Sequence, residues 1–290
     1  MGNKENKENE ANLKYFGNPE EILRRFEFLK EHEQGTVCLR DTPEYQIVVE
    51  KNGTQILMYF AQPDGDPLRR FSSGVMSRVD IEEPLNLTSV YTQAMMLSLL
   101  WKPEPSMVCV MGFGGGRIPM VLHHYFPRLL IESTEIDPAV LEIAEKYFGI
   151  VLDNRMRVHM EDARSFLSNR PSTTKYDIIF LDCFTGMGHH PFELSTEEFY
   201  DLCKKHLAQG GVVSSNIIEN DTLFHKKMQM FTDSFQHVWR YRNPYGTNVF
   251  YGSENDISEE ELVNRAKELL YRYDFEFPFI ELLVSILRIK

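Results

Sequence analysis

The stretch that decides the fold is V-C-V-M-G-F-G-G-G-R-I-P, residues 108–119. An apolar run leads into a loop in which four of five residues are glycine, and a helical pattern follows. Glycine lets the backbone turn tightly and lets a ligand approach without a Cβ in the way, and the helix N-terminus favours anionic groups. We therefore predict a ligand-binding loop whose cofactor-binding residues are Gly112, Gly114, Gly115 and Gly116. A tight turn without a ligand is the alternative for this loop alone.

Downstream of the loop, strand patterns alternate with helix patterns. The expected strands are Met107–Met111, Leu129–Glu135, Arg157–Met160, Tyr176–Leu181 and Gly211–Asn216. The expected helices between them are Ile118–Tyr125, Ala139–Phe148, Ala163–Leu167 and Thr196–His206. Alternation with short connections predicts a mostly parallel sheet with helices on both faces, closed by a hairpin at residues 238–251. The predicted fold class is α/β, Rossmann-like and doubly wound, with a mostly parallel seven-stranded sheet and a small N-terminal antiparallel β unit.

The residues upstream of the loop predict that small β unit. Residues 1–12 are polar and rich in Lys, Glu and Asn, which predicts a disordered tail. Residues 13–84 predict an N-terminal helix and the antiparallel unit, with Asn52-Gly53 as a hairpin-turn signal. A helical pattern follows from Asn86 to Trp101. Residues 85–290 are expected to form the Rossmann-like domain.

An acidic residue ends the strand that follows the glycine loop. Glu135 lies 23 residues after Gly112, where a carboxylate can accept hydrogen bonds from both hydroxyls of a ribose. We count Glu135 and its neighbour Ile136 among the cofactor-binding residues. Taken singly, a carboxylate of this kind is more often a solvated loop acid.

Two more acidic motifs follow the next two strands. Glu161, Asp162 and Ala163 come after the third strand, at the same sheet edge, where they can meet an adenine amine. The motif Asp182-Cys-Phe-Thr185 comes after the fourth strand, across the switch point from the glycine loop. Features of this kind at consecutive strand ends favour a nucleoside-cofactor pocket over solvated acids.

The charge composition indicates which classes of partner the chain can bind. Lys and Arg number 31 against 43 Asp and Glu, a formal net charge of -12. A surface of that sign repels phosphate backbones and attracts cations, so we expect a basic protein or an amine-bearing small molecule and no nucleic acid. No stretch reaches the roughly 18 apolar residues of a membrane span. The four cysteines lack disulfide or CxxC spacing, which favours a reducing, cytoplasmic setting without a membrane. The sequence leaves open whether the chain forms a homodimer.

The run from Val108 to Asn216 resembles the spermidine-synthase superfamily. The matching motifs are the glycine loop, Glu135-Ile-Asp137, Asp162-Ala163, Tyr176–Asp182 and Leu207-Ala-Gln-Gly-Gly211. The resemblance covers roughly residues 40–255, including the small β unit. It implies a Rossmann-like fold and a pocket for S-adenosylmethionine or decarboxylated S-adenosylmethionine.

Two departures separate this chain from the aminopropyltransferases of that superfamily. Those enzymes carry an aspartate in the glycine loop, as GGGDG, which binds the amine of the decarboxylated cofactor, and here Gly115 takes its place. They also carry DSSD after the fourth strand, and here Thr185 replaces the last aspartate. Loss of the loop aspartate removes a charge that would repel the carboxylate of S-adenosylmethionine. The loop and residues 126–149 are similar to the spermidine-synthase-like methyltransferase branch.

The leading hypothesis is an S-adenosylmethionine-dependent methyltransferase that acts on an amine or similar nucleophile. The predicted catalytic residues are Asp182, Tyr91 and Thr185, with Glu83 and Asn216 as further candidates near the pocket. The alternative is an aminopropyltransferase of polyamine biosynthesis, and a third is a catalytically silent binding module. His189-His190 has no evident third ligand, so no metal is expected.

Overall fold

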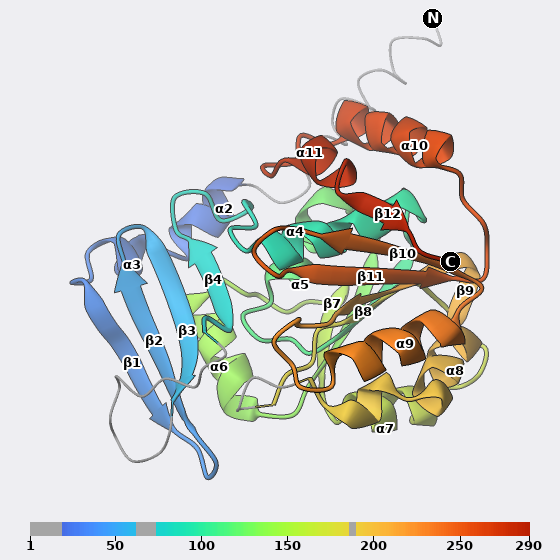
Figure 1. Ribbon diagram of the computed structural model, residues 1–290. Coiled ribbons are helices and arrows are strands. Elements are labelled where there is room, and N and C mark those ends of the chain that lie inside the picture. Colours follow the sequence, from blue (N-terminus) through green and yellow to red (C-terminus); the bar gives the residue numbers. More distant parts are fainter. Residues whose placement is uncertain (1–18, 62–73, 186–189) are drawn as a thin grey trace, which may run out of the picture.

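The computed structural model describes residues 19–61, 74–185 and 190–290 (Figure 1). The predicted tail, residues 1–12, lies outside the described residues. The elements of the N-terminal part are α2 Pro19–Arg24, α3 Glu27–Lys30, β1 Gly35–Asp41, β2 Gln46–Asn52, β3 Gln55–Ala61 and β4 Ser77–Asp80.

The rest of the chain builds the large domain. Its helices are α4 Val90–Met96, η2 Leu97–Leu100, α5 Arg117–Tyr125, α6 Pro138–Tyr147, α7 Ala163–Asn169, η3 Phe192–Ser195, α8 Glu197–Lys205, α9 Phe224–Ser234, α10 Glu259–Arg272 and α11 Phe279–Leu283. Its strands are β5 Met107–Met111, β6 Leu130–Glu135, β7 Met156–Met160, β8 Tyr176–Leu181, β9 Leu207–Asn216, β10 His237–Arg242, β11 Asn248–Ser253 and β12 Ile286–Arg288.

The small sheet is antiparallel in the order β1-β2-β3-β4. Asn52 pairs with Gln55, so the two-residue loop between β2 and β3 is Gly53-Thr54. The turn signal at Asn52-Gly53 therefore places the loop one residue too early. Only Gly53 of this pair has a positive φ, at 62°, and glycine adopts that conformation without a steric cost.

The large sheet has the order β12-β10-β11-β9-β8-β5-β6-β7, with β5 to β9 parallel and the last three strands antiparallel. The α/β, doubly wound fold class is confirmed. The predicted count of seven strands is wrong, because β12 adds an eighth strand beside β10. β12 has only three residues, too few to show an alternating pattern.

Helices cover both faces of the large sheet, and the strands alternate accordingly. Val108 and Val110 of β5 pack with α4, α5, α6 and α10, whereas Cys109 and Met111 point to the opposite face and pack with α7, α8 and α9. Figure 1 shows α7, α8 and α9 on the side of the sheet away from α10 and α11. Both faces of this sheet are buried, as in other doubly wound proteins.

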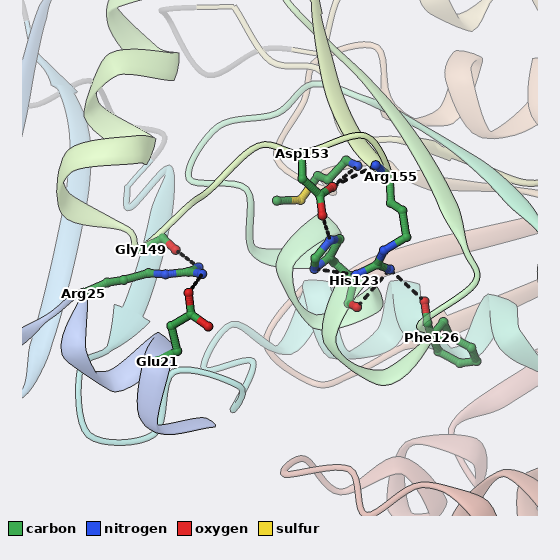
Figure 2. A network of polar contacts seen from close by, with 8 residues as sticks. Glu21, Arg25, His123, Phe126, Gly149, Asp153 and Arg155 are labelled. Atoms are coloured by element: carbon green, nitrogen blue, oxygen red, sulfur yellow. Dashed lines mark hydrogen bonds and ion pairs between the residues drawn. The ribbon is translucent and has the colours of Figure 1, made fainter. Parts of the chain in front are cut away.

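Polar contacts dock the N-terminal helix on the large domain (Figure 2). The Arg25 guanidinium donates to the Gly149 carbonyl over 2.9 Å and lies 3.8 Å from the Glu21 carboxylate. Gly149 has a φ of +68°, and an added Cβ would lie 2.5 Å from Cζ of Phe26. The helix can approach the loop after α6 this closely because position 149 carries no side chain.

A second group of contacts in Figure 2 joins the end of α5 to the start of β7. His123 Nε2 lies 3.0 Å from the Asp153 carboxylate, and the Arg155 guanidinium donates to the Phe126 carbonyl over 3.2 Å. Burial lowers the pKa of His123. These contacts join α5 to the start of β7, at the end of the parallel strands opposite to their carboxyl ends.

Candidate functional site

A cavity of about 450 Å³ lies where the chain reverses direction across the large sheet. β5 has β6 on one side and β8 on the other, so the loops after β5 and β8 diverge. Ligands of open α/β sheets bind at such a point, beside the carboxyl ends of the strands. Residues of the small sheet, among them Met58, Phe60 and Ser77, line the cavity from the other side.

The glycine loop after β5 separates into an open and a buried part. Gly112 and Gly114 line the cavity, and both have positive φ, at 89° and 52°. Gly115 and Gly116 are buried instead and are not among the lining residues. The Gly115 N–H donates to Ser77 Oγ over 2.8 Å. The structure therefore places Gly112 and Gly114 of the four predicted cofactor-binding glycines at the cavity, and Gly115 and Gly116 behind its wall.

Glu135 lies at the end of β6 with its carboxylate held by the backbone. Oε2 accepts from the Gly114 N–H over 3.2 Å, and Oε1 accepts from the N–H groups of Ile136 and Asp137 over 2.8 and 3.1 Å. Burial raises the pKa of Glu135, and these bonds oppose the rise. A carboxylate has about four lone-pair sites, so this one keeps acceptor capacity for a ligand. Ile136 lines the same cavity.

The small sheet adds a residue that the sequence analysis missed. The Tyr45 hydroxyl donates to the Asp137 carboxylate over 2.5 Å, and Asp137 also caps α6 by accepting from the Ala139 N–H. Burial and this carboxylate raise the pKa of Tyr45. Tyr45 therefore fixes the small sheet against the rim of the cavity.

The motif after β7 reaches the cavity with two of its three residues. Asp162 and Ala163 line it, and Asp162 Oδ1 caps α7 by accepting from the Ser165 N–H over 2.9 Å. Glu161 is not among the lining residues and accepts from Asn169 Nδ2 over 2.8 Å. Of the three residues predicted to bind the cofactor here, Glu161 is thus the one that the structure places outside the cavity, with its carboxylate turned along α7.

Three side chains from distant elements meet at the inner wall of the cavity. Asp182 Oδ1, after β8, accepts from Asn216 Nδ2, at the end of β9, over 3.0 Å. The Tyr91 hydroxyl of α4 forms a hydrogen bond with the same carboxyl group. Burial raises the pKa of Asp182 to about 7, although both hydrogen bonds oppose this shift.

This group of three lies beside a second, smaller cavity of about 240 Å³. Tyr91 and Phe184 line both cavities, and Asn216 lines the smaller one. Thr185 is exposed and lines the larger cavity next to Asp182. The structure therefore brings together all three predicted catalytic residues and Asn216.

Glu83 is the candidate that the structure places elsewhere. It is exposed, accepts from Asn86 Nδ2 over 3.2 Å and lines a separate cavity with Glu276. The predicted helix from Asn86 is shorter in the structure, since α4 begins at Val90, and the Glu83 side chain does not line the larger cavity.

The described part of the chain contains no set of side chains suited to bind a metal ion. Within residues 19–61, 74–185 and 190–290, no group of three or more His, Cys, Asp or Glu side chains could hold one. His190 is buried, with Nδ1 3.0 Å from the Pro191 carbonyl, and burial lowers its pKa to about 4. His189 lies outside the described residues. Over the same ranges, no helix is both long and apolar enough to cross a membrane.

The model of the spermine/spermidine synthase domain family matches residues 89–253. This chain belongs to that family. The matched residues run from the start of α4 to the end of β11 and include the glycine loop and every side chain of the Asp182 group.

Relatives within and near the family have two activities. A polyamine aminopropyltransferase of Vibrio vulnificus is 29% identical over 183 residues, which are 62% of this chain and 61% of that enzyme. The eEF1A lysine and N-terminal methyltransferase of Bos taurus is 33% identical over 138 residues, which are 43% of this chain and 20% of that protein. The chain thus spans less than two thirds of either relative.

A solved structure of a methyltransferase is also similar to this chain. Human methyltransferase-like protein 13, in complex with SAH, superposes with a TM-score of 0.55 at 25% sequence identity, covering 65% of this chain and 90% of that one. The relatives named here are therefore transferases, of either aminopropyl or methyl groups.

Proposed function

We propose that this chain is an S-adenosylmethionine-dependent methyltransferase that acts on an amine. The observation that carries the proposal is the Asp182 carboxyl group, held by Tyr91 and Asn216 at the wall between two cavities. A cofactor in the larger cavity and an acceptor in the smaller one would then meet beside a group that can take a proton.

The residues of the larger cavity suit a nucleoside cofactor. The Glu135 carboxylate, oriented by three backbone N–H groups, has the position to accept from ribose hydroxyls. Asp162 lies at the next strand end, where it can meet the adenine. Gly112 and Gly114 leave the loop backbone open to close approach.

The chain has three tasks in methyl transfer. S-adenosylmethionine supplies a methyl group that is already activated on a sulfonium sulfur, so the protein must align the amine, exclude water and remove a proton. An amine attacks only when it is neutral. Because the pKa of Asp182 is about 7, its carboxylate can accept that proton near neutral pH.

Two neutral positions support methyl transfer over aminopropyl transfer. The aminopropyltransferases that the sequence resembles carry aspartates where this chain has Gly115 and Thr185. At Gly115, an added Cβ would lie 2.8 Å from both Phe148 Cδ1 and Ser77 Cβ, so the loop has no room for an acidic side chain. The positive group of a decarboxylated cofactor would therefore lack its partner there.

The uncharged lining of the smaller cavity favours an acceptor substrate with a single amine. Among the described residues, none that lines it is charged, and its polar side chains include Asn216, Asn220 and Tyr245. A polyamine bound there would leave its second ammonium without a counter-charge. The formal charge of -12 favours a basic protein or an amine-bearing small molecule that reaches the site from the cytoplasm.

Aminopropyl transfer to a polyamine is the second candidate. The coverage of the relatives favours this candidate. The match covers 61% of the length of the aminopropyltransferase relative but only 20% of the length of the methyltransferase relative. One experiment separates the two candidates. Purified protein is incubated with S-adenosylmethionine or with its decarboxylated form, together with basic proteins, peptides and polyamines, and both thioether products are measured by mass spectrometry.

Formation of S-adenosylhomocysteine and a methylated amine supports methyl transfer. Formation of methylthioadenosine and a longer polyamine would replace it with the second candidate. The Asp182→Asn variant serves as the control, because it keeps the shape of the cavity and loses the proton acceptor.

A further inference from the structure

A buried arginine in the cofactor cavity has no counter-ion among the described residues. Arg117 is only 5% exposed and lines the larger cavity. No ion pair joins it to any carboxylate in the part of the chain that the structure describes, and its Nε has no hydrogen-bond partner there. Burial lowers its pKa to about 10, with no neighbouring charge to oppose the shift.

The contacts that Arg117 does make are with uncharged groups. Nη1 lies 2.9 Å from the Met120 sulfur, a poor acceptor, and Nη2 donates to the Pro84 carbonyl. Arg117 is also the first residue of α5, which follows Gly116 as the cap. A cation at that end of a helix opposes the helix dipole.

Burial without a counter-ion and the helix dipole both disfavour the charged form of Arg117. An anionic group of a bound ligand would stabilise it. A buried cation is tolerated when it is paired, and an unpaired one costs several kcal/mol. Arg117 contacts the segment after β4, and α5 packs against α4 and β4. It is therefore on the side of the cavity that holds Tyr91 and Ser77.

We propose that Arg117 binds the carboxylate of the methionine end of the cofactor and so selects S-adenosylmethionine over its decarboxylated form. This inference rests on the proposed function, because it presumes a cofactor with its nucleoside at Glu135. An Arg–carboxylate pair in a water-poor site is charge-assisted and directional. The protein would then select S-adenosylmethionine over the decarboxylated cofactor by an attractive contact, because a ligand without the carboxylate leaves Arg117 unpaired.

The test measures binding and not turnover. Titration calorimetry compares S-adenosylhomocysteine with its decarboxylated analogue, which differ only in the carboxylate, on the wild-type protein and on Arg117→Met and Arg117→Lys. Arg117→Met should weaken S-adenosylhomocysteine by about tenfold to a hundredfold and change binding of the analogue by less than about threefold. Arg117→Lys should keep part of the preference.

Arg155, which is half-buried, offers a control for the general effect of replacing an arginine by methionine. The Arg155 guanidinium is held by the His123 and Phe126 carbonyls and is not a cavity residue. Arg155→Met should leave the ratio of the two affinities unchanged. Melting curves without ligand show whether each variant is folded, and Arg117→Met should melt no lower than Arg155→Met because it removes an unpaired buried charge.

Equal losses for both ligands in a folded Arg117→Met variant would overturn the inference, and so would an unchanged preference for the carboxylated ligand. If the wild-type protein binds neither ligand, the proposed cofactor is wrong and Arg117 is not the cause. Calorimetry therefore separates failure of the inference from failure of the proposed function.

Discussion

Asn216 and Asp182 lie 34 residues apart in the sequence, and Asn216 Nδ2 donates to Asp182 Oδ1 over 3.0 Å. They meet because β8 and β9 are parallel neighbours whose carboxyl ends lie at the same edge of the sheet. The bond orients the carboxyl group, which also forms a hydrogen bond with the Tyr91 hydroxyl. The proposed chemistry depends on this relationship.

Asp182→Asn should abolish most of the transfer while the cofactor still binds. Loss of a general base typically lowers kcat by about 10²- to 10⁴-fold. In the wild-type protein, kcat/KM should fall as the pH is lowered through about 7, the pKa of Asp182, because the protonated carboxyl cannot accept a proton. A pH–rate profile of both proteins checks this. A wild-type profile that is flat across this range would exclude Asp182 as the base.

The same variant should be more stable than the wild type at alkaline pH. The pKa of Asp182 rises from 3.8 to about 7 on folding, so the folded state binds the proton more tightly than the unfolded one. The stability that this group contributes is complete below 3.8 and is lost as the pH rises to about 7. Melting temperatures at pH values on either side of this range measure the difference, which should shrink in acid.

Tyr91→Phe should move the pH profile without removing activity. The Tyr91 hydroxyl stabilises the charged form of Asp182 and so lowers the pKa of that carboxyl. Removing the hydroxyl raises the pKa, and the rise of kcat/KM should shift to higher pH. If Tyr91 only packs against the cavity, KM changes and the midpoint of the profile stays where it is.

Glu135→Ala should weaken cofactor binding by about tenfold to a hundredfold, since hydrogen bonds to a charged group are lost. It also removes the acceptor of the Gly114 N–H, so the loop loses part of its support. Glu161→Ala is the matched control, because Glu161 contacts Asn169 outside the cavity. Calorimetry with S-adenosylhomocysteine should show little change for this control, and equal losses in both variants would contradict the assignment.

The buried strands of the fold were the easiest part to predict from the sequence. The bounds of β5 and β8 agree with the prediction at both ends, because both strands are apolar runs in the middle of the sheet. β1 was not recognised as a strand, since most of its residues are exposed and show no alternation. α11 and β12 were missed because they are short.

The site was predictable where strand ends bring it together. Glu135, Asp162 and Asp182 follow parallel strands, so the alternation of elements places them at one edge. Tyr45 and Ser77 were missed because they reach the cavity through the packing of the small sheet, which no local pattern encodes. Arg117 did leave a signal, since a cation in the first turn of a helix after a glycine loop opposes the helix dipole.

Gly149→Ala should destabilise the docking of the N-terminal helix. The new Cβ would lie 2.5 Å from Phe26 Cζ at a φ of +68°, and overpacking typically costs about 1–3 kcal/mol. Gly210→Ala is the control, because φ is +72° there but the nearest atom is 3.7 Å away. The difference between their unfolding free energies isolates the clash with Phe26, and similar values for both would mean that backbone strain alone matters.

Charge selection at the glycine loop is best tested at Ser77 and not at Gly115. Gly115→Asp and Gly115→Asn should both destabilise the protein, because any Cβ there meets Phe148 and Ser77 at 2.8 Å. Ser77 lines the cavity and accepts from the Gly115 N–H. Ser77→Asp should weaken S-adenosylhomocysteine more than its decarboxylated analogue, since like charges oppose each other by up to about 4 kcal/mol at ~4 Å. Asn is nearly the same size as Asp but is uncharged, so Ser77→Asn should not discriminate between the two ligands. If the two variants shift both affinities alike, a like charge at this end of the cavity does not govern cofactor choice.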